Sequence, residues 1–354
     1  MVLDYEIKTE KVKNSRLPDI DFDNIPFGRV FTDHMLVSDY MNGEWQETSI
    51  MPFQELRLSP ACTVLHYGQE IFEGMKAYRN DDGDAFIFRP YENLKRMNFS
   101  AERMVMPKIP KEIFIEGIKQ LISLDRNWIP RTTGSALYIR PFMIATDEYV
   151  GIRPSDNYKF ITFCSPVNSY YAEPIKVKID QEYVRAAKGG IGEAKTGGNY
   201  AASLYAAHHA HKNGYSQVLW TDAIEHKWIQ ESGTMNVFFV IGDKVITPNL
   251  DGSILQGVTR DTVITLLKDN EYKIEERPIS VDEVVEAYHN GLLKEVFGAG
   301  TAAVIAHICA IGFNEEDMTL PPVEDWEVAN WLLKTMNGIK EFTLPDKYGW
   351  MVKA

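Results

Sequence analysis

Apolar and polar positions alternate or recur at helical spacing, and this pattern divides the first half of the chain into short elements. It predicts hairpins over 35–47 and 75–88, helices after Pro90 and Pro110, and strands over 135–146 and 158–164. Asn42-Gly43 is a turn sequence typical of two-residue hairpins. Pro141 lies inside a predicted strand and indicates an edge strand or an irregular one, because proline has no N–H for the ladder.

The second half has the same mixture of elements. It predicts strands over 175–180, 217–220, 235–241 and 244–247, with helices over 199–213, from about residue 259 and from about residue 280. Ser280 and Glu283 have the spacing of a capping box. The apolar run 296–313 contains three glycines, Thr301 and His307, so we expect a buried strand, a loop and a helix there rather than a membrane span.

The mixture of elements, the chain length and the positions of two prolines predict an α/β (α+β) chain of two domains. Its 354 residues suit about two domains of ~150 residues each. Pro166 and Pro174 bracket a polar and aromatic stretch with no helical period. We therefore predict an N-terminal domain over 1–165, a linker over 166–174 and a second domain over 175–354.

Charge and cysteine content exclude several classes of protein. The net charge of −13 argues against partners such as nucleic acid or an anionic membrane surface. Cys62, Cys164 and Cys309 are too few and too widely spaced for a disulfide framework or a zinc site, which favours a reducing, cytoplasmic location. The acidic N-terminal residues include no apolar run, so no targeting segment is predicted.

The most informative segment is a glycine-rich loop that carries one lysine directly before a predicted helix, Lys188-Gly-Gly-Ile-Gly-Glu-Ala-Lys195-Thr-Gly-Gly-Asn-Tyr200. A Walker A loop needs glycine where Ala194 stands, and a dinucleotide fingerprint needs a third glycine that is missing. Glycines on both sides let the backbone approach a flat ligand closely. A lysine held there can form a Schiff base with an aldehyde such as pyridoxal phosphate, although a lone loop lysine is more often solvated.

Such a cofactor requires further groups, and the sequence has a candidate for each. Its phosphate needs an arginine and a helix N-terminus, for which Arg96 and Gly257-Val258-Thr259 are available. Its pyridine nitrogen needs a carboxylate, here Glu231, and its phenolic oxygen a donor, here Tyr200. Taken singly, these residues are equally well a solvated charge, a helix cap, a turn residue and a helix-face aromatic.

Two other patterns indicate different chemistry. Gly298-Ala-Gly300-Thr-Ala-Ala303 matches a dinucleotide fingerprint, on which alone a nicotinamide oxidoreductase would rest. Because the chain after it is too short for a Rossmann half, we interpret it as a turn whose N–H groups face an anion. His208, His209 and His211 share a helix but have no carboxylate partner, so we predict exposed residues and no metal site.

Together the motifs resemble a known family, the branched-chain amino-acid aminotransferases of pyridoxal-phosphate fold type IV. The resemblance extends from about Phe27 to Trp350 and rests on these segments: His66-Tyr-Gly-Gln-Glu-Ile-Phe-Glu-Gly74, Tyr138-Ile-Arg-Pro141, Lys195-Thr-Gly-Gly-Asn-Tyr200, Glu231-Ser-Gly-Thr-Met-Asn236, Gly257-Val-Thr-Arg-Asp261 and Gly300-Thr-Ala302. It implies a smaller N-terminal α/β domain, a larger C-terminal α/β pseudo-barrel domain, and a homodimer in which a loop of the partner helps to close the site. Some relatives carry a Cys-x-x-Cys thiol pair where Ala303 and Ala306 stand here, so that switch is not expected.

The resemblance also implies roles for individual residues. Lys195 would hold pyridoxal 5'-phosphate and shuttle the proton, Tyr200 would bond the phenolic oxygen, and Glu231 would pair with the pyridinium. The other cofactor-binding residues would be Arg96, Val258, Thr259 and Thr301 at the phosphate, with Thr234, Asn236 and Gly257 from the same motifs. The side-chain pocket would comprise Tyr67, Phe72, Tyr138 and Tyr170, and the turn with Gly300, Thr301 and Ala302 would present N–H groups to the substrate α-carboxylate.

A transaminase must accept two kinds of substrate at one site. Leucine, isoleucine and valine need an apolar wall, whereas glutamate needs a cation for its second carboxylate. Tyr138 and Arg140 lie two apart on a predicted strand and therefore point to the same side, where Arg140 can fork a carboxylate. We thus predict amino transfer from these amino acids to 2-oxoglutarate. A D-amino-acid aminotransferase, an aminodeoxychorismate lyase and a non-catalytic phosphate-binding protein remain as alternatives.

Overall fold

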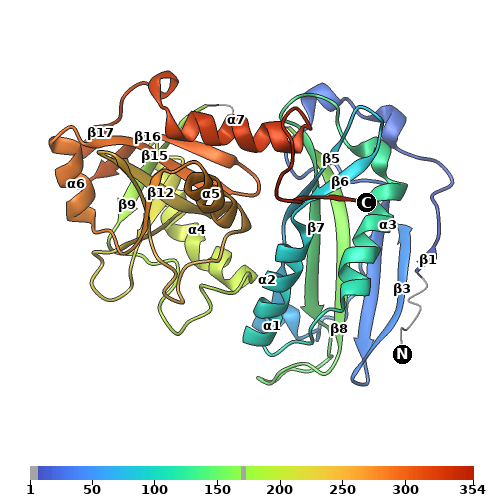
Figure 1. The fold of residues 1–354 in the computed structure, drawn as a ribbon. Coiled ribbons are helices and arrows are strands. Elements are labelled where there is room, and N and C mark those ends of the chain that lie inside the picture. Colours follow the sequence, from blue (N-terminus) through green and yellow to red (C-terminus); the bar gives the residue numbers. More distant parts are fainter. Residues whose placement is uncertain (1–6, 169–172) are drawn as a thin grey trace. The chain divides into compact units, whose positions relative to one another are not determined.

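The computed structural model describes residues 7–168 and 173–354, and the chain forms two compact units (Figure 1). The first unit contains the described residues up to 168 together with Ala194–Gly197 and Gly338–Ala354. The second contains the described residues from 173 to Glu193 and Gly198–Asn337. The sequence predicts one larger domain over 175–354. In the structure, the C-terminal segment instead joins the first unit and makes it the longer of the two.

The first unit is built on a nine-stranded, mostly antiparallel sheet. Its order is β1-β3-β2-β8-β7-β5-β6-β18, with β4 paired to β7. The strands are β1 (Lys8–Thr9), β2 (His34–Met41), β3 (Glu44–Pro52), β4 (Glu70–Phe72), β5 (Met75–Arg79), β6 (Ala85–Phe88), β7 (Ala136–Ala145), β8 (Tyr158–Val167) and β18 (Met351–Lys353). The two predicted hairpins are confirmed as β2–β3 and β5–β6.

Of the two alternatives predicted at Pro141, the irregular strand is confirmed and the edge strand is not. β7 lies inside the sheet, between β8 and β5. Proline is accommodated because β7 changes partner at this point: β5 pairs with 137–139 and β4 with 142–144. Pro141 stands in the gap between them, where its carbonyl accepts the Glu73 N–H at 2.7 Å.

Helices cover the sheet of the first unit (Figure 1). They are α1 (Val64–Tyr67), α2 (Pro90–Arg103) and α3 (Gly117–Leu124), which continues a π-helical turn over Glu112–Glu116. Short 3₁₀ turns occupy Leu17–Asp19, Phe22–Asn24 and Arg126–Trp128. α3 packs on β2 and β3, and a Cβ at Gly117 would press on Leu36, so glycine lets helix and sheet approach closely. Phe114, Trp128 and Phe160 are fully buried in this core.

The second unit contains a sheet that closes on itself. Its order is β11-β10-β9-β16-β15-β12-β13-β14, and β11 also pairs with β12. The strands β11, β10, β9, β16, β15 and β12 therefore form a closed ring, which agrees with the predicted pseudo-barrel. The strands are β9 (Ile175–Asp180), β10 (Gln217–Thr221), β11 (Ile229–Ser232), β12 (Met235–Ile241), β13 (Lys244–Thr247), β14 (Lys273–Glu276), β15 (Leu293–Gly300), β16 (Val304–Phe313) and β17 (Glu316–Thr319).

The apolar run 296–313 is a hairpin, so the predicted helix at its end is wrong. β15 leads through residues 301–303 into β16, and the two strands pair antiparallel from Phe297–His307 to Gly300–Val304. A buried apolar run can be strand or helix, and here burial on both faces of the barrel strand produced the ambiguity. The match from Gly298 to Ala303 is thus a strand end and a hairpin turn, which lacks the helix that a dinucleotide fingerprint requires.

The helices predicted over 199–213, from about residue 259 and from about residue 280 are confirmed as α4 (Gly197–Lys212), α5 (Val258–Asp269) and α6 (Val281–His289). α7 (Val328–Lys340) was not predicted; it begins in the second unit, and its last residues belong to the first. A 3₁₀ turn occupies Val323–Asp325. The Ser280 hydroxyl caps α6 by accepting the Glu283 N–H at 3.0 Å. Phe238 and Phe297 stack on the paired strands β12 and β15, with ring centroids 5.1 Å apart. Within the described residues, every helix is too short or too polar to cross a membrane.

Candidate active site

Lys195 is held by hydrogen bonds of the first unit. Its N–H donates to the Ser100 hydroxyl of α2 at 2.9 Å, and its carbonyl accepts the Phe72 N–H at 3.0 Å. The next residue, Thr196, is buried and donates its hydroxyl to the Glu70 carbonyl at 2.6 Å. The lysine therefore projects from a fixed backbone, although its side chain is only half-buried.

Two cations lie against the Phe72 ring, and one of them, Arg140, also lies against the Tyr138 ring. The Lys195 ammonium and the Arg140 guanidinium each lie 4.8 Å from the centroid of Phe72, within cation–π range. Arg140 also donates to the Tyr138 hydroxyl at 3.1 Å, which confirms that these two side chains share one side of β7. A Cβ at Gly74 would collide with that hydroxyl, so the motif requires glycine there.

Arg140 has donor capacity that the described part of the chain does not use. Its Nε is buried without a hydrogen-bond partner, and no described carboxylate lies within ion-pair distance of it. The Arg140 charge acts on Glu70, whose pKa is raised by burial although the Gly197 N–H and the Arg140 charge lower it. This corner of the first unit can therefore take a carboxylate next to an aromatic wall.

Arg96, predicted at the cofactor phosphate, makes a two-pronged contact with Glu73. Its Nε and Nη2 lie 2.7 and 2.8 Å from the two carboxylate oxygens, and Asn93 donates to the same group at 2.7 Å. Burial raises the pKa of Glu73, but Arg96 outweighs this and lowers it overall. Pairing of the guanidinium with Glu73 through two of its N–H groups orients Arg96.

Two predicted pocket residues are not placed with this group. Tyr67 lies on α1, 41% exposed, with its ring beside His66. Tyr170 lies outside the described residues. The aromatic group that the first unit brings together is thus Phe72 with Tyr138, to which Phe27 adds an edge contact at 5.7 Å between centroids.

In the second unit, Glu231 is a buried acid held from two sides. It lies on β11, 3% exposed, with Oε2 at 2.9 Å from Nε of Arg185. Oε1 accepts the Leu255 N–H at 2.7 Å and Asn236 Nδ2 at 3.3 Å. An acid buried beside an arginine carries its negative charge, because the pair offsets the desolvation that either ion alone would suffer. The arrangement is suited to holding a cationic ring nitrogen.

Tyr200 and Glu231 converge on one narrow cavity. It is lined by Arg185, Asn199, Tyr200, Ser203, Glu231, Gly233, Thr234 and Leu255. The glycine loop reaches this cavity because Asn199 Nδ2 donates to the Ile191 carbonyl at 2.8 Å. The neighbouring Gly192 allows a close approach to the Ser253 carbonyl, where a Cβ would collide. This glycine thus serves backbone packing rather than the contact with a flat ligand that the sequence suggests.

Two backbone segments of the second unit have the local structure that the sequence predicts, a helix N-terminus and a turn. Gly257 is the N-cap of α5, and Val258 and Thr259 form its buried first turn, where helix N–H groups have no intrahelical acceptor. A Cβ at Gly257 would collide with the Asn236 amide, which explains the glycine. Thr301 and Ala302 form the half-buried turn between β15 and β16.

The predicted exposure of the three helix histidines is confirmed, and two buried charged residues were not predicted. His208, His209 and His211 are exposed on α4, and the described residues contain no cluster of His, Cys, Asp or Glu suited to a metal. Sequence reasoning missed Arg185 and Glu73, which orient Glu231 and Arg96. Glu73 lies inside a quoted motif, but no spacing rule links Arg185 to Glu231.

Comparison with known proteins identifies the family of the chain. The family model described as amino-transferase class IV matches residues 70–311. "Branched-chain-amino-acid aminotransferase 2" of Bacillus subtilis is 46% identical over 348 residues, covering 97% of this chain and 96% of that protein. The "Branched-chain-amino-acid aminotransferase" of Mycolicibacterium smegmatis is 43% identical over 339 residues, covering 93% and 92%.

Solved structures give the same result. The Escherichia coli branched-chain amino acid aminotransferase is 27% identical with a TM-score of 0.71, covering 89% of this chain and 98% of that one. The T.th. branched-chain amino acid aminotransferase, complexed with N-(5'-phosphopyridoxyl)-L-glutamate, is 26% identical with a TM-score of 0.71, covering 89% and 97%. Within the second unit, the buried Glu231 and the N-terminus of α5 offer the carboxylate and the N–H groups that pyridoxal 5'-phosphate requires. With this match over most of its length the chain belongs to the class IV aminotransferases, enzymes that use that cofactor.

Proposed function

We propose that this protein is a branched-chain amino-acid aminotransferase. It moves the amino group reversibly between leucine, isoleucine or valine and 2-oxoglutarate, giving branched 2-oxo acids and glutamate. The names of the relatives at 43–46% identity support this substrate class. The single observation that carries it within the chain is Arg140, whose Nε is buried beside the rings of Phe72 and Tyr138 and has no hydrogen-bond partner among the described residues.

That arrangement serves both kinds of substrate. The side-chain carboxylate of glutamate takes the unused Arg140 donors in a charge-assisted hydrogen bond. A branched aliphatic side chain instead contacts the aromatic wall, in which we place Phe72 and Tyr138, with Tyr170 as a further candidate. The turn with Thr301 and Ala302 holds the α-carboxylate that both substrates share. The exposure of Tyr67 suits a side chain that lines the site of a second subunit.

The remaining site residues bind the cofactor and move protons. When bound, pyridoxal phosphate supplies an aldehyde for the amino group and a ring that accepts electrons. Lys195 attaches it and transfers the proton at the substrate Cα, while Tyr200 donates to the phenolic oxygen. Glu231 holds the positive charge on the ring nitrogen. The phosphate lies against Arg96 and the N–H groups of Val258, Thr259 and Thr301, in a cradle shaped by Thr234, Asn236 and Gly257.

We further propose a cytoplasmic homodimer. α4 exposes a run of apolar residues, including Leu204 at 68% and Tyr205 at 57%, and such a face is typical of a protein–protein interface. Cys62, Cys164 and Cys309 are all free thiols, which suits a reducing compartment. Sedimentation of the purified protein at several concentrations tests the dimer, and a monomer at all of them contradicts it.

The activity is tested by amino transfer from L-leucine to 2-oxoglutarate, with glutamate as the measured product. We expect a yellow protein that catalyses this reaction, with valine and isoleucine also accepted. Turnover of D-amino acids alone would instead identify the D-amino-acid enzyme of the same fold. A colourless protein without turnover would indicate a phosphate-binding protein.

The role of Lys195 is tested by reducing the cofactor-loaded protein with borohydride and mapping the adduct by mass spectrometry. The adduct should lie on Lys195, and Lys195→Ala should neither retain the cofactor covalently nor turn over. Lys188, in the same loop, provides the matched control as Lys188→Ala, which should keep both properties. An adduct on Lys188 would contradict the assignment.

A further inference from the structure

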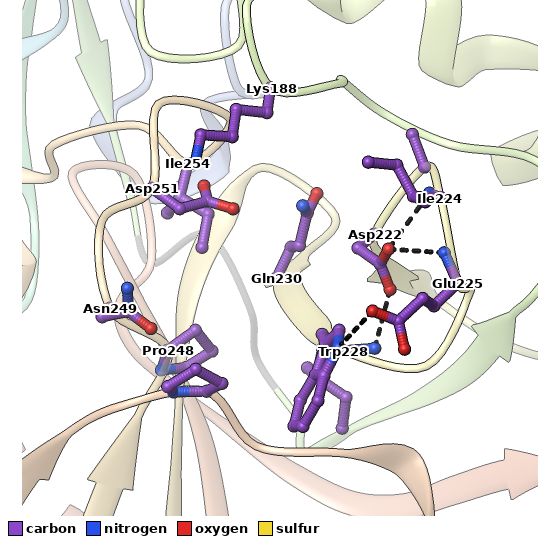
Figure 2. A pocket seen from close by; sticks show the side chains of 13 residues that line it. Lys188, Asp222, Ile224, Glu225, Trp228, Gln230, Pro248, Asn249, Asp251 and Ile254 are labelled. Carbon is purple, nitrogen blue, oxygen red and sulfur yellow. Dashed lines mark hydrogen bonds between the residues drawn. The ribbon is translucent and has the colours of Figure 1, made fainter.

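The second unit has a cavity that the proposed catalytic residues do not line. It has a volume of about 240 Å³ and lies between the loop over 222–228 and the segment over 248–254 (Figure 2). Drug-sized ligands occupy pockets of roughly 300–1,000 Å³, so this one suits a molecule of few heavy atoms. Its lining includes Lys188, Asp222, Glu225, Trp228, Gln230 and Asp251.

Gln230 leaves a buried acceptor in this cavity. Its side chain projects inward from β11, and the residue is only 4% exposed (Figure 2). The orientation of its amide is fixed, because the Ser253 hydroxyl donates to Asp251 at 2.6 Å and must therefore accept from Gln230 Nε2, at 2.7 Å. Oε1 then has no hydrogen-bond partner in the described part of the chain. A buried carbonyl oxygen of this kind requires a donor.

The charges around the cavity select a positively charged donor. Asp222, Glu225 and Asp251 contribute three carboxylates, against the single ammonium of Lys188. Asp222 stays ionised, because four backbone N–H groups outweigh its burial and lower its pKa to about 2. Apolar contact is supplied by the Trp228 ring and by Ile254 and two prolines, Pro248 and Pro278.

From these observations we propose that the cavity is a binding site for a small aliphatic primary ammonium. The ammonium donates to Gln230 Oε1 among the carboxylates, and the hydrocarbon part packs on Trp228 and Ile254. The site is separate from the proposed catalytic one, since neighbouring residues of a strand face opposite sides and Glu231 follows Gln230 on β11. Hydrogen bonds nevertheless connect the two sites through the segment over 253–255. Arg185 donates to the Ser253 carbonyl at 2.6 Å, and Glu231 accepts the Leu255 N–H.

The test is calorimetric titration of cofactor-loaded protein whose cofactor has first been fixed with borohydride, so that amines cannot react with it. Three probes of equal shape are compared: 3-methylbutylamine, 3-methylbutanol and 3-methylbutanoate. We expect the protonated amine to bind with a single-site isotherm, more tightly than the alcohol, with the carboxylate weakest. Gln230→Leu should weaken binding of the amine by about tenfold to a hundredfold, the value of a charge-assisted hydrogen bond.

Two further variants complete the test. Ala223→Leu fills the cavity without removing a buried polar group, and it should abolish binding even if Gln230→Leu fails to fold. Gln120→Leu makes the same exchange at an exposed position of α3 and should leave the affinity unchanged. Amine binding no tighter than alcohol binding, or unaffected by Ala223→Leu, would overturn the proposal and leave a cavity that holds solvent.

The ammonium has two natural sources, a free amine or the α-amino group of an amino acid. L-Leucine titrated into the same fixed protein distinguishes them. If amino acids are the ligands, Lys188→Ala should weaken leucine binding by about tenfold and leave the amine unaffected, because Lys188 lies at the rim, where a carboxylate would emerge. Tight amine binding with no leucine binding identifies simple amines as the class.

Discussion

At the scale of single residues, two of the proposed site residues are held in buried ion pairs. Arg185 is buried beside Glu231, and its Nη2 also donates to the carbonyls of Gly192 and Ser253. Glu73 is fully buried beside Arg96 in the same manner. Each pair fixes the orientation of a residue to which we assign cofactor binding, so we expect the partner to be as necessary as the residue itself.

The Arg185–Glu231 pair predicts non-additive stability. Arg185→Met leaves a buried carboxylate without its partner and should destabilise the cofactor-free protein by about 3–5 kcal/mol. Glu231→Gln added to it removes the orphaned charge, so the double variant should recover part of that loss. Recovery stays partial because two carbonyls still lack their donor. Urea unfolding of the wild type, both single variants and the double variant measures this, and additive losses would contradict a coupled pair.

Sequence patterns could predict that Tyr138 and Arg140 lie together, but they could not predict the pairing of Arg185 with Glu231. The period of a strand places Tyr138 and Arg140 on one side, and the contact between them confirms it. Arg185 and Glu231 lie on separate segments that meet only in the folded second unit. No local period connects them, and a lone arginine in a sequence reads as a surface charge.

At the scale of elements, one side chain organises the loop over 222–228. The Asp222 carboxylate accepts the N–H groups of Ile224, Glu225, Lys227 and Trp228, at 2.8–3.0 Å. These bonds outweigh burial and lower the pKa of Asp222 from 3.8 to about 2. A depressed carboxyl pKa stabilises the fold above its ordinary value, and this contribution disappears as the pH falls from about 4 towards 2.

Asp222→Asn should therefore lower the free energy of unfolding at neutral pH by about 1 kcal/mol, a value reduced for the solvent contact of this half-buried group. The difference from the wild type should shrink as the pH approaches 2, since the aspartate is then protonated. Unfolding in denaturant at a series of pH values measures it, with the exposed Asp325→Asn as a control that should show neither effect. A difference that does not change with pH would refute the charge-based explanation.

The elements themselves were largely predictable, and the wrong helix at the end of 296–313 and the open choice at Pro141 have physical causes. Turn residues such as Asn42-Gly43 specify a hairpin locally, as β2 and β3 confirm. In contrast, β16 follows a three-residue turn and is buried on both faces, so its apolar run lacks the alternation that distinguishes a strand. Pro141 left the choice between an edge and an irregular strand open, because its effect depends on where β7 changes partner, which the sequence of β7 alone does not encode.

At the scale of the whole molecule, the chain returns to its first unit at the end. β18 pairs with β6, and the Trp350 carbonyl accepts the Arg89 N–H at 2.8 Å. The Arg89 guanidinium lies 5.1 Å from the Trp350 ring. Sequence order suggested one C-terminal domain, because a pairing between strands so far apart in the chain leaves no local signal.

Deletion of residues 349–354 should loosen the first unit selectively. Loss of Trp350 alone removes a large buried side chain, worth about 3–5 kcal/mol. Hydrogen exchange should accelerate in β5 and β6, whereas β12 and β15 of the second unit keep their protection. Equal acceleration in both sheets would contradict the assignment of the tail to the first unit.

The most direct test of the account is whether Arg140 separates the two substrates. Single-turnover reactions of Arg140→Met, followed by cofactor absorbance with each amino acid alone, measure this, and Arg153→Met serves as an exposed control. The lost charge-assisted bond is worth about 1.5–3 kcal/mol, so the half-reaction with glutamate should slow by roughly tenfold to a hundredfold or more. The half-reaction with leucine should be largely unchanged, because it uses the aromatic wall. An equal loss for leucine and glutamate would contradict recognition of both substrates at this one site.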